Sequence, residues 1–185
     1  LCPKKYCEMI FKLIQYQEAQ CVLEMGTALG ITTAYMASTN CSEVATMEGD
    51  PALLDWAAKV WTKLGLHGIR AYMGPFDTTL GMFESDLSRT PRLNAQPSEF
   101  SKLDMAFVDG NHRKQPTLDY VSRLKTSLNT NGVIIIDDIY WSREMTEAWE
   151  ILRNDDFFTI TVDLYRMGLL FNREAVPKQH FILKY

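Results

Sequence analysis

Three acidic residues and a histidine follow two apolar segments of the chain. Asp109 and His112 belong to FVDGNH, and Asp137 and Asp138 close the run NGVIIIDD. Three carboxylates brought close together repel one another, so they need a cation or protons to compensate their charge. Oxygen ligands suit Mg²⁺ or Ca²⁺. Asp109, Asp137 and Asp138 are therefore candidate ligands of a divalent cation.

The same residues also fit proton transfer. Histidine titrates near neutral pH, so His112 is a candidate general base. Asp109 and Asp137 are the competing candidates for this role. Other interpretations need no catalysis: His112 can hydrogen-bond a loop carbonyl, and aspartates at strand ends can cap helices or face solvent.

A glycine-containing turn forms a second candidate site, in the segment EMGTALG from Glu24 to Gly30. Gly26 lets the backbone turn sharply and lets a ligand approach it, and Gly30 permits close packing where a helix begins. Ala28 and Ile31 stand where a dinucleotide-binding loop has its second and third glycines, which argues against an NAD-dependent oxidoreductase. The spacing also occurs in α/β turns that bind nothing.

Glu48 narrows the class of ligand that this turn is expected to bind. It ends the next apolar segment, at the position where an acid accepts hydrogen bonds from both hydroxyls of a ribose. A carboxylate there favours an adenosine ligand and would repel a ribose 2′-phosphate. The alternative is a solvated glutamate at a strand end.

The elements that position these residues alternate along the chain. Strand-like runs over 21–25, 43–48, 69–74, 102–110 and 131–138 are separated by helical patterns, with a polar loop expected over 88–98. This alternation predicts a parallel sheet covered by helices on both faces, with the ligand crevice at the carboxyl ends of its strands. Three strand-like runs after residue 156 have no helix between them, and a β-hairpin would account for at least two of them.

Composition and charge exclude several classes of protein. The chain of 185 residues has a formal net charge of −4 and is 46% hydrophobic, which predicts one domain over 1–185 with no nucleic-acid partner. No run approaches the length of a membrane-spanning helix, so we expect no membrane association and a cytoplasmic location. A helix is expected within 1–19, and because the chain begins at Leu1 instead of Met, we expect further residues before it.

In combination, these motifs resemble the class I S-adenosylmethionine (SAM)-dependent methyltransferases. The resemblance rests on E-x-G-x-x-x-G at Glu24–Gly30, Glu48 in MEGDP, FVDGNH and IIIDDIYW, and it is closest to the O-methyltransferase-like branch with a D-G-x-H-type motif. It implies a doubly wound, Rossmann-like sheet of seven strands in the order 3-2-1-4-5-7-6, with helices on both faces and the last strand antiparallel.

The resemblance also implies roles for single residues. Glu24, Gly26 and Gly30 would surround the methionine part of SAM, and Glu48 would hold the ribose. Gly49, Gly74 and Phe76 would border the adenine, and Thr27 and Asp109 would contact the amino-acid end. The family's metal-dependent O-methyltransferases place acids as Asp109, Asp137 and Asp138 are placed, although Asp138 stands where catechol-type enzymes carry Asn.

The sequence therefore predicts a methyltransferase that uses SAM on a small-molecule acceptor, most readily a hydroxyl oxygen. Mg²⁺ or another divalent cation would assist, or else His112 or an aspartate would serve as a metal-free base. The alternative from another class is a SAM-binding module without catalytic activity. A homodimer is a candidate assembly.

Overall fold

The computed structural model describes residues 1–89 and 102–185 of the chain. Most of the loop expected over 88–98 lies outside these residues; Ser88 belongs to the last turn of a helix. The described residues form two compact units, Leu1–Lys102 and Leu103–Tyr185. The prediction of a single domain stays a prediction.

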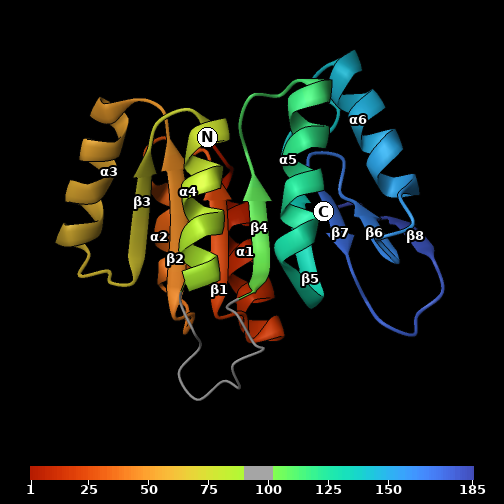
Figure 1. The fold of residues 1–185 in the computed structure, drawn as a ribbon, viewed down its shortest axis with the longest axis horizontal. Coiled ribbons are helices and arrows are strands. Elements are labelled where there is room, and N and C mark those ends of the chain that lie inside the picture. The colour runs from red at the N-terminus through yellow and green to blue at the C-terminus, as the bar shows by residue number, and fades with distance from the viewer. Residues whose placement is uncertain (90–101) are drawn as a thin grey trace. The chain divides into compact units, whose positions relative to one another are not determined.

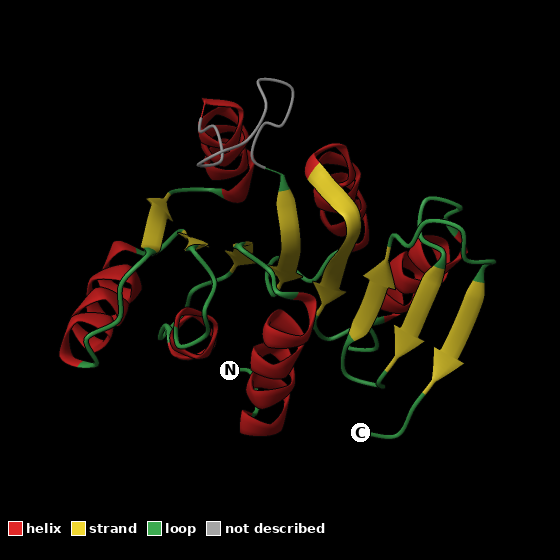
Figure 2. Ribbon diagram, turned by 90° about the horizontal axis from the view of Figure 1, so that it is seen from below, coloured by secondary structure: helices red, strands yellow, loops and turns green. Residues whose placement is uncertain are grey.

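The first unit is a three-stranded parallel sheet in the order β3-β2-β1. Figure 2 shows α4 on one face of these strands and α1, α2 and α3 on the opposite face. The elements of this unit alternate along the chain: α1 Lys4–Gln17, β1 Cys21–Met25, α2 Ile31–Ala37, β2 Glu43–Glu48, α3 Pro51–Lys63, β3 Ile69–Met73 and α4 Phe76–Arg89.

Local sequence signals place the boundaries of these elements. The Asp50 carboxylate accepts a hydrogen bond from the Ala52 amide at 2.8 Å, and Pro51 occupies the first turn of α3. Gly65 follows the helix with a φ of 67°, as expected for the residue that ends a helix in the left-handed region. All five residues of β1 are buried, including the acidic Glu24.

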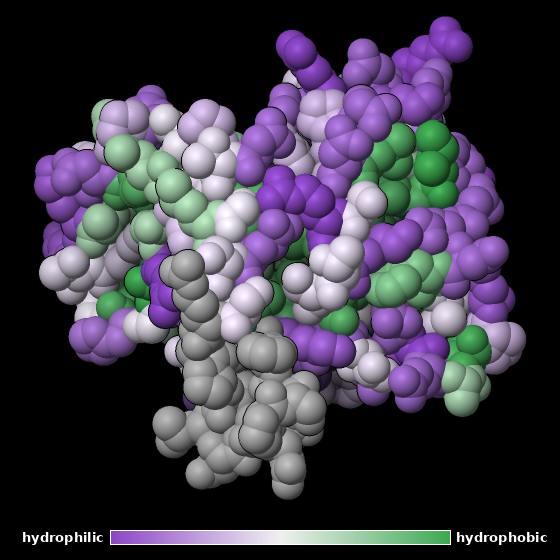
Figure 3. All heavy atoms as spheres, in the orientation of Figure 1, coloured by the Kyte–Doolittle hydropathy of each residue, from purple (hydrophilic) through white to green (hydrophobic). Residues whose placement is uncertain are grey.

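The second unit contains five strands in the order β4-β5-β7-β6-β8. β4 and β5 are parallel, β7 is antiparallel to both β5 and β6, and β8 is parallel to β6. Helices α5 and α6 lie side by side, and hydrophilic residues cover most of their outer face (Figure 3). The elements are β4 Leu103–Val108, α5 Lys114–Ser127, β5 Leu128–Ile136, α6 Arg143–Asn154, β6 Ile160–Asp163, β7 Gly168–Phe171 and β8 Gln179–Ile182.

The strand order expected from the resemblance is confirmed: 3-2-1 in the first unit and 4-5-7-6 in the second (Figure 1). The expected number of strands is wrong by one, because β8 pairs with β6 as an eighth strand. β8 lies at the edge of the second unit's strands, and its four residues are all exposed. The hairpin expected near the end of the chain is β6–β7.

The start of β5 also differs from the prediction. β5 begins at Leu128, three residues before the strand-like run expected over 131–138, and Leu128 pairs with Leu103. Asn131 adopts a φ of 70° inside the strand, and the pairing with β4 is irregular there. This backbone conformation forms an irregularity within a strand in place of a chain reversal.

Among the described residues, no helix is long and apolar enough to cross a membrane.

Candidate functional site

The glycine turn between β1 and α2 is held against the end of β2. The amides of Gly26 and Thr27 both donate to the carbonyl of Met47, at 3.0 and 3.1 Å, and the amide of Gly30 donates to Thr27 at 2.8 Å. Gly26 has a φ of 108°, which requires glycine, and Ala28 has a φ of 46°, which is costly for a residue with a Cβ. The turn is thus a tight, strained backbone structure, as is common at ligand-binding sites.

Gly30 is needed for packing. A Cβ at this position would lie 2.6 Å from Trp61 Nε1 and 2.7 Å from Ala57 Cβ, both on α3. The Trp61 indole donates a hydrogen bond to the Gly30 carbonyl at 2.9 Å. The predicted close packing at the start of α2 is confirmed, and it joins α2 to α3.

Glu24 lies beneath the turn and is completely buried. Its Oε2 accepts hydrogen bonds from the hydroxyls of Thr33 and Thr46, at 2.5 and 2.6 Å. The Thr46 hydroxyl is also 2.6 Å from that of Thr27. These contacts place Glu24 as an internal support that links β1, β2 and α2 to Thr27. Thr33 and Thr46 could not be recognised from the sequence, because threonines on buried element faces carry no distinctive spacing.

Glu48 lies at the rim of the same turn. Its Oε2 accepts from the amide of Ala28 at 2.8 Å, and its Oε1 accepts from the amides of Gly49 and Asp50 at 2.8 and 2.9 Å. The carboxylate therefore joins the end of β2 to the glycine turn, and its role at a ribose stays a prediction.

The turn after β3 completes this part of the first unit. The Gly74 amide donates to the Glu48 carbonyl at 2.9 Å, and a Cβ on Gly49 would lie 3.9 Å from the Gly74 carbonyl. Gly74 has a φ of 138°, and Phe76 begins α4 with its side chain half-buried. The structure thus places the predicted cofactor residues of this unit at the turns that follow β1, β2 and β3, with Glu24 buried beneath the first of them.

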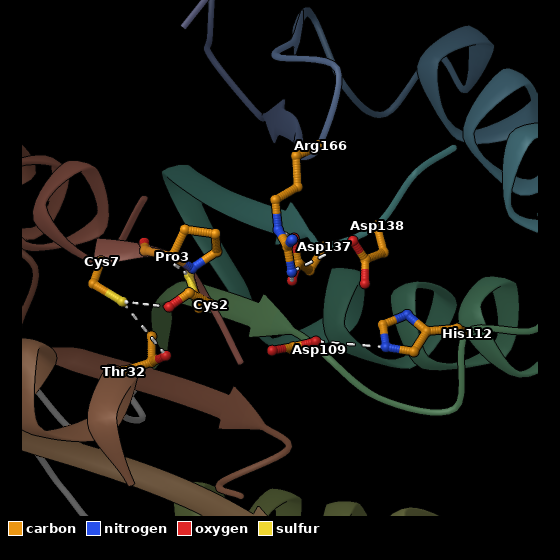
Figure 4. Close-up of polar contacts among 9 residues, drawn as sticks. All are labelled: Cys2, Pro3, Cys7, Thr32, Asp109, His112, Asp137, Asp138 and Arg166. Carbon is orange, nitrogen blue, oxygen red and sulfur yellow. Dashed lines mark hydrogen bonds and ion pairs between the residues drawn. The ribbon is translucent and has the colours of Figure 1, made fainter. Parts of the chain in front are cut away.

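The acidic residues of the second unit also lie together, at the ends of β4 and β5 (Figure 4). Asp109 follows β4, and its Oδ1 is 3.5 Å from His112 Nε2. Asp138, after β5, adopts a φ of 54°. Burial, together with the neighbouring carboxylates of Asp137 and Asp138, raises the pKa of Asp109 to about 7, against the opposing effect of Arg166. Asp109 can therefore bind or release a proton near neutral pH.

Asp137 has a partner that the sequence analysis missed. Its fully buried carboxylate receives two hydrogen bonds from the Arg166 guanidinium, Nε to Oδ1 at 2.9 Å and Nη2 to Oδ2 at 2.8 Å. Arg166 Nη2 also lies 3.4 Å from Asp138 Oδ1. Arg166 lies in the β6–β7 turn, far in the sequence from the motifs that contain the three aspartates. The sequence pointed to such a partner only through the need of three neighbouring carboxylates for a compensating positive charge.

The contacts of Arg166 bear on the divalent-cation site predicted at Asp109, Asp137 and Asp138. Asp137, one of the three candidate ligands, has both oxygens bound by a guanidinium. Among the described residues, no three His, Cys, Asp or Glu side chains are grouped as metal ligands would be. The donor set around Asp137 does not fit a divalent cation while Arg166 is in place.

The fold defines the class to which the protein belongs. Three similar solved structures are the O-methyltransferase TomG from Streptomyces achromogenes, involved in tomaymycin synthesis and solved with SAM, an O-methyltransferase from Bacillus cereus with S-adenosylhomocysteine (SAH), and the SAH-bound methyltransferase PaMTH1 from Podospora anserina. Their TM-scores are 0.75, 0.72 and 0.72, at 17%, 17% and 15% identity. The matches cover 94%, 92% and 95% of this chain and 82%, 82% and 80% of theirs, and they establish a methyltransferase fold.

The family follows from the sequence itself. Residues 23–139, more than half of the chain, match the model of a methyltransferase domain family, and the chain belongs to that family. No curated protein sequence matches it.

Proposed function

We propose that the protein transfers the methyl group of SAM to a hydroxyl oxygen of a small molecule. Membership of a methyltransferase family supports methyl transfer, and the similar O-methyltransferases support an oxygen acceptor. The observation that carries the proposal is the pairing of Asp109 with His112 at the end of β4. An acceptor hydroxyl must lose a proton during methylation, and this pair provides a place for it.

The glycine turn fits SAM as the methyl donor. Gly26, Thr27 and Gly30 would lie along the methionine part, with Glu24 supporting Thr27 from below. Gly49, Gly74 and Phe76 would border the adenine. A carboxylate can accept about four hydrogen bonds, and Glu48 receives one backbone hydrogen bond at Oε2 and two at Oε1. Glu48 Oε2 can therefore accept a further hydrogen bond from a ribose hydroxyl.

Methyl transfer from SAM requires no covalent intermediate with the protein. SAM supplies a methyl group on a sulfonium, and as the new carbon–oxygen bond forms, the carbon–sulfur bond breaks and its electron pair stays on sulfur. His112 accepts the hydroxyl proton, and the Asp109 carboxylate orients the ring and compensates the imidazolium charge. A second candidate for the base is Asp109 itself, because its pKa of about 7 suits proton transfer near neutral pH. Its expected contact with the amino-acid end of SAM stays a prediction.

Calorimetry with SAM and SAH tests the cofactor site. Glu48→Gln removes the charge of the acceptor, and we expect roughly 10- to 100-fold weaker binding, as for the loss of a charged hydrogen bond. The matched control is Glu43→Gln at the opposite end of β2, where the Glu43 side chain pairs with Arg70. The affinity of this variant for SAM should equal that of the wild type. Absence of SAM and SAH binding at millimolar concentration would refute the cofactor assignment.

SAH release across a panel of hydroxyl-bearing acceptors tests the transfer. His112→Gln should lower kcat by roughly 10²- to 10⁴-fold and leave the affinity for SAM unchanged, and His67→Gln at an exposed position is its control. Loss of turnover in Asp109→Asn, with His112→Gln still active, would instead assign Asp109 as the base. SAM binding without turnover of any acceptor would favour a catalytically inactive SAM-binding module.

A further inference from the structure

Asp109, Asp137 and Asp138 form an acidic cluster. Within it, the Asp137–Arg166 ion pair is the one in which both carboxylate oxygens are hydrogen-bonded to the cation. Both oxygens of Asp137 are hydrogen-bonded to one guanidinium, in the parallel geometry that makes arginine–carboxylate pairs strong. The Asp137 carboxylate has no exposed surface, and the Arg166 side chain is 29% exposed. In Figure 4, the guanidinium of Arg166 points to Asp137, and Asp138 lies next to Asp137.

The backbone fixes both partners of this pair. The Asp137 amide donates to the Val108 carbonyl at 3.0 Å, which holds the end of β5 to the end of β4. The Ile139 amide donates to the Arg166 carbonyl at 3.1 Å, so the segment that carries Asp137 is bonded directly to the turn that carries Arg166. Main-chain hydrogen bonds thus hold the backbones of Asp137 and Arg166 near each other, so the guanidinium needs little reorganisation to reach the carboxylate.

The β6–β7 turn is itself constrained to present Arg166. Tyr165 adopts a φ of 66°, and its amide donates to Asp163 Oδ1 at 2.8 Å. The Leu164 amide donates to the Met167 carbonyl at 2.9 Å, which closes the turn. Asp163 is buried and also accepts from the Trp149 indole at 3.1 Å. A network anchored in α6 and β6 therefore sets the direction in which Arg166 leaves the turn.

A divalent cation at Asp137 would have to displace this guanidinium. The displacement would break a buried ion pair and leave two like charges, the cation and Arg166, beside each other. Arg166 already supplies one positive charge within hydrogen-bonding or ion-pair distance of both Asp137 and Asp138. The cluster therefore contains the counterion that its carboxylates require.

We propose that Arg166 is the resident cation of the acidic cluster and occupies the place of a divalent metal ion. Arg166 acts through Asp137 and Asp138, which makes it a positioning residue of the second unit. In this protein the cluster then binds no divalent cation, and activation of an acceptor there depends on Asp109 and His112. The role of Asp109 and His112 in this inference rests on the proposed function, whereas the exclusion of a divalent cation by Arg166 does not, because its test measures cation binding alone.

Sensitised Tb³⁺ luminescence and Mg²⁺ calorimetry on the full chain test the proposal. Tyr140 and Trp141 lie two and three residues after Asp138 and are the aromatic side chains expected to sensitise a bound lanthanide. We expect no saturable binding of either ion below millimolar concentration in the wild type. Arg166→Met, which keeps an unbranched side chain but removes the guanidinium and its charge, should bind Tb³⁺ roughly 100-fold more tightly or better, the effect of removing a buried competing charge.

Two further variants complete the experiment. Adding Asp137→Asn to Arg166→Met should abolish the gained site, and Arg153→Met, which removes a guanidinium paired with Glu150 on α6, should gain none. Arg166→Gln is the substitute if Arg166→Met does not fold, as judged by its thermal transition. Sub-millimolar binding of Mg²⁺ by the wild type would overturn the proposal, and so would a folded Arg166 variant that binds Tb³⁺ no better than the wild type. Calorimetry with SAM on the same samples tells such a failure apart from a failure of the cofactor assignment.

Discussion

Replacing Gly30 by alanine tests how the cofactor turn is built. Gly30 has a φ of 71°, and the new Cβ would meet Trp61 Nε1 at 2.6 Å and Ala57 Cβ at 2.7 Å. The left-handed backbone conformation costs an alanine about 1 to 2 kcal/mol. Overpacking adds about 1 to 3 kcal/mol. A shift of Trp61 also weakens its hydrogen bond to the Gly30 carbonyl, so we expect a total loss of about 3 to 5 kcal/mol in the free energy of unfolding.

Gly65 provides a matched control. Its φ of 67° is almost the same as that of Gly30, but nothing lies within 4 Å of the position that its Cβ would take. Gly65→Ala therefore measures the backbone cost alone, about 1 to 2 kcal/mol. The difference between the two variants isolates the overlap with α3.

Urea denaturation followed by tryptophan fluorescence measures both variants. We expect Gly30→Ala to be less stable than Gly65→Ala by about 2 kcal/mol, a difference of about 4 to 8 °C in Tm for a chain of this size. In Trp61→Phe, which removes the indole nitrogen, Gly30→Ala should cost less than it does in the wild type. Equal destabilisation by Gly30→Ala and Gly65→Ala, within about 0.5 kcal/mol of each other, would refute the packing explanation.

Two further predictions concern buried carboxylates. Because the pKa of Asp109 is raised to about 7 in the folded protein from its usual 3.8, its contribution makes stability fall as pH rises between about 4 and 7. Asp109→Asn should remove this dependence and raise stability at pH 8 by about 2 to 4 kcal/mol, measured by urea titration at pH 5 and pH 8. An equal change at both pH values would contradict it. Thr33→Val removes a hydroxyl that donates to Glu24 and should cost about 1.5 to 3 kcal/mol. The same change at exposed Thr62, whose hydroxyl bonds only its own helix, should cost less than 0.5 kcal/mol, and equal losses at both sites would argue against a supporting role for Glu24.

The parts of the fold that could be predicted are those specified by nearby residues. Asp50 and Ser142 stand directly before helical patterns, where their residue types favour a helix cap, and both accept a backbone amide in the structure. The clustering of polar residues at strand ends followed from the parallel arrangement of the strands.

The missed features depend on residues distant in the sequence. Arg166 meets Asp137 across 29 positions, through a hairpin turn whose path no local pattern fixes. The extension of β5 to Leu128 depends on its pairing with Leu103, and at the helix boundary this tertiary pairing prevailed over the local pattern. The Asn131-Gly132 dipeptide is typical of turns, yet both residues lie within β5.

The edge strand β8 has a consequence for the behaviour of the protein in concentrated solution. Its exposed side chains include Phe181 and Ile182, and an apolar strand at the edge of a sheet is a template for intermolecular pairing. Lys178 and Lys184 flank this segment, and charged residues in such flanking positions oppose aggregation. We therefore expect that neutralising these two lysines would promote aggregation of the folded protein without altering either candidate site.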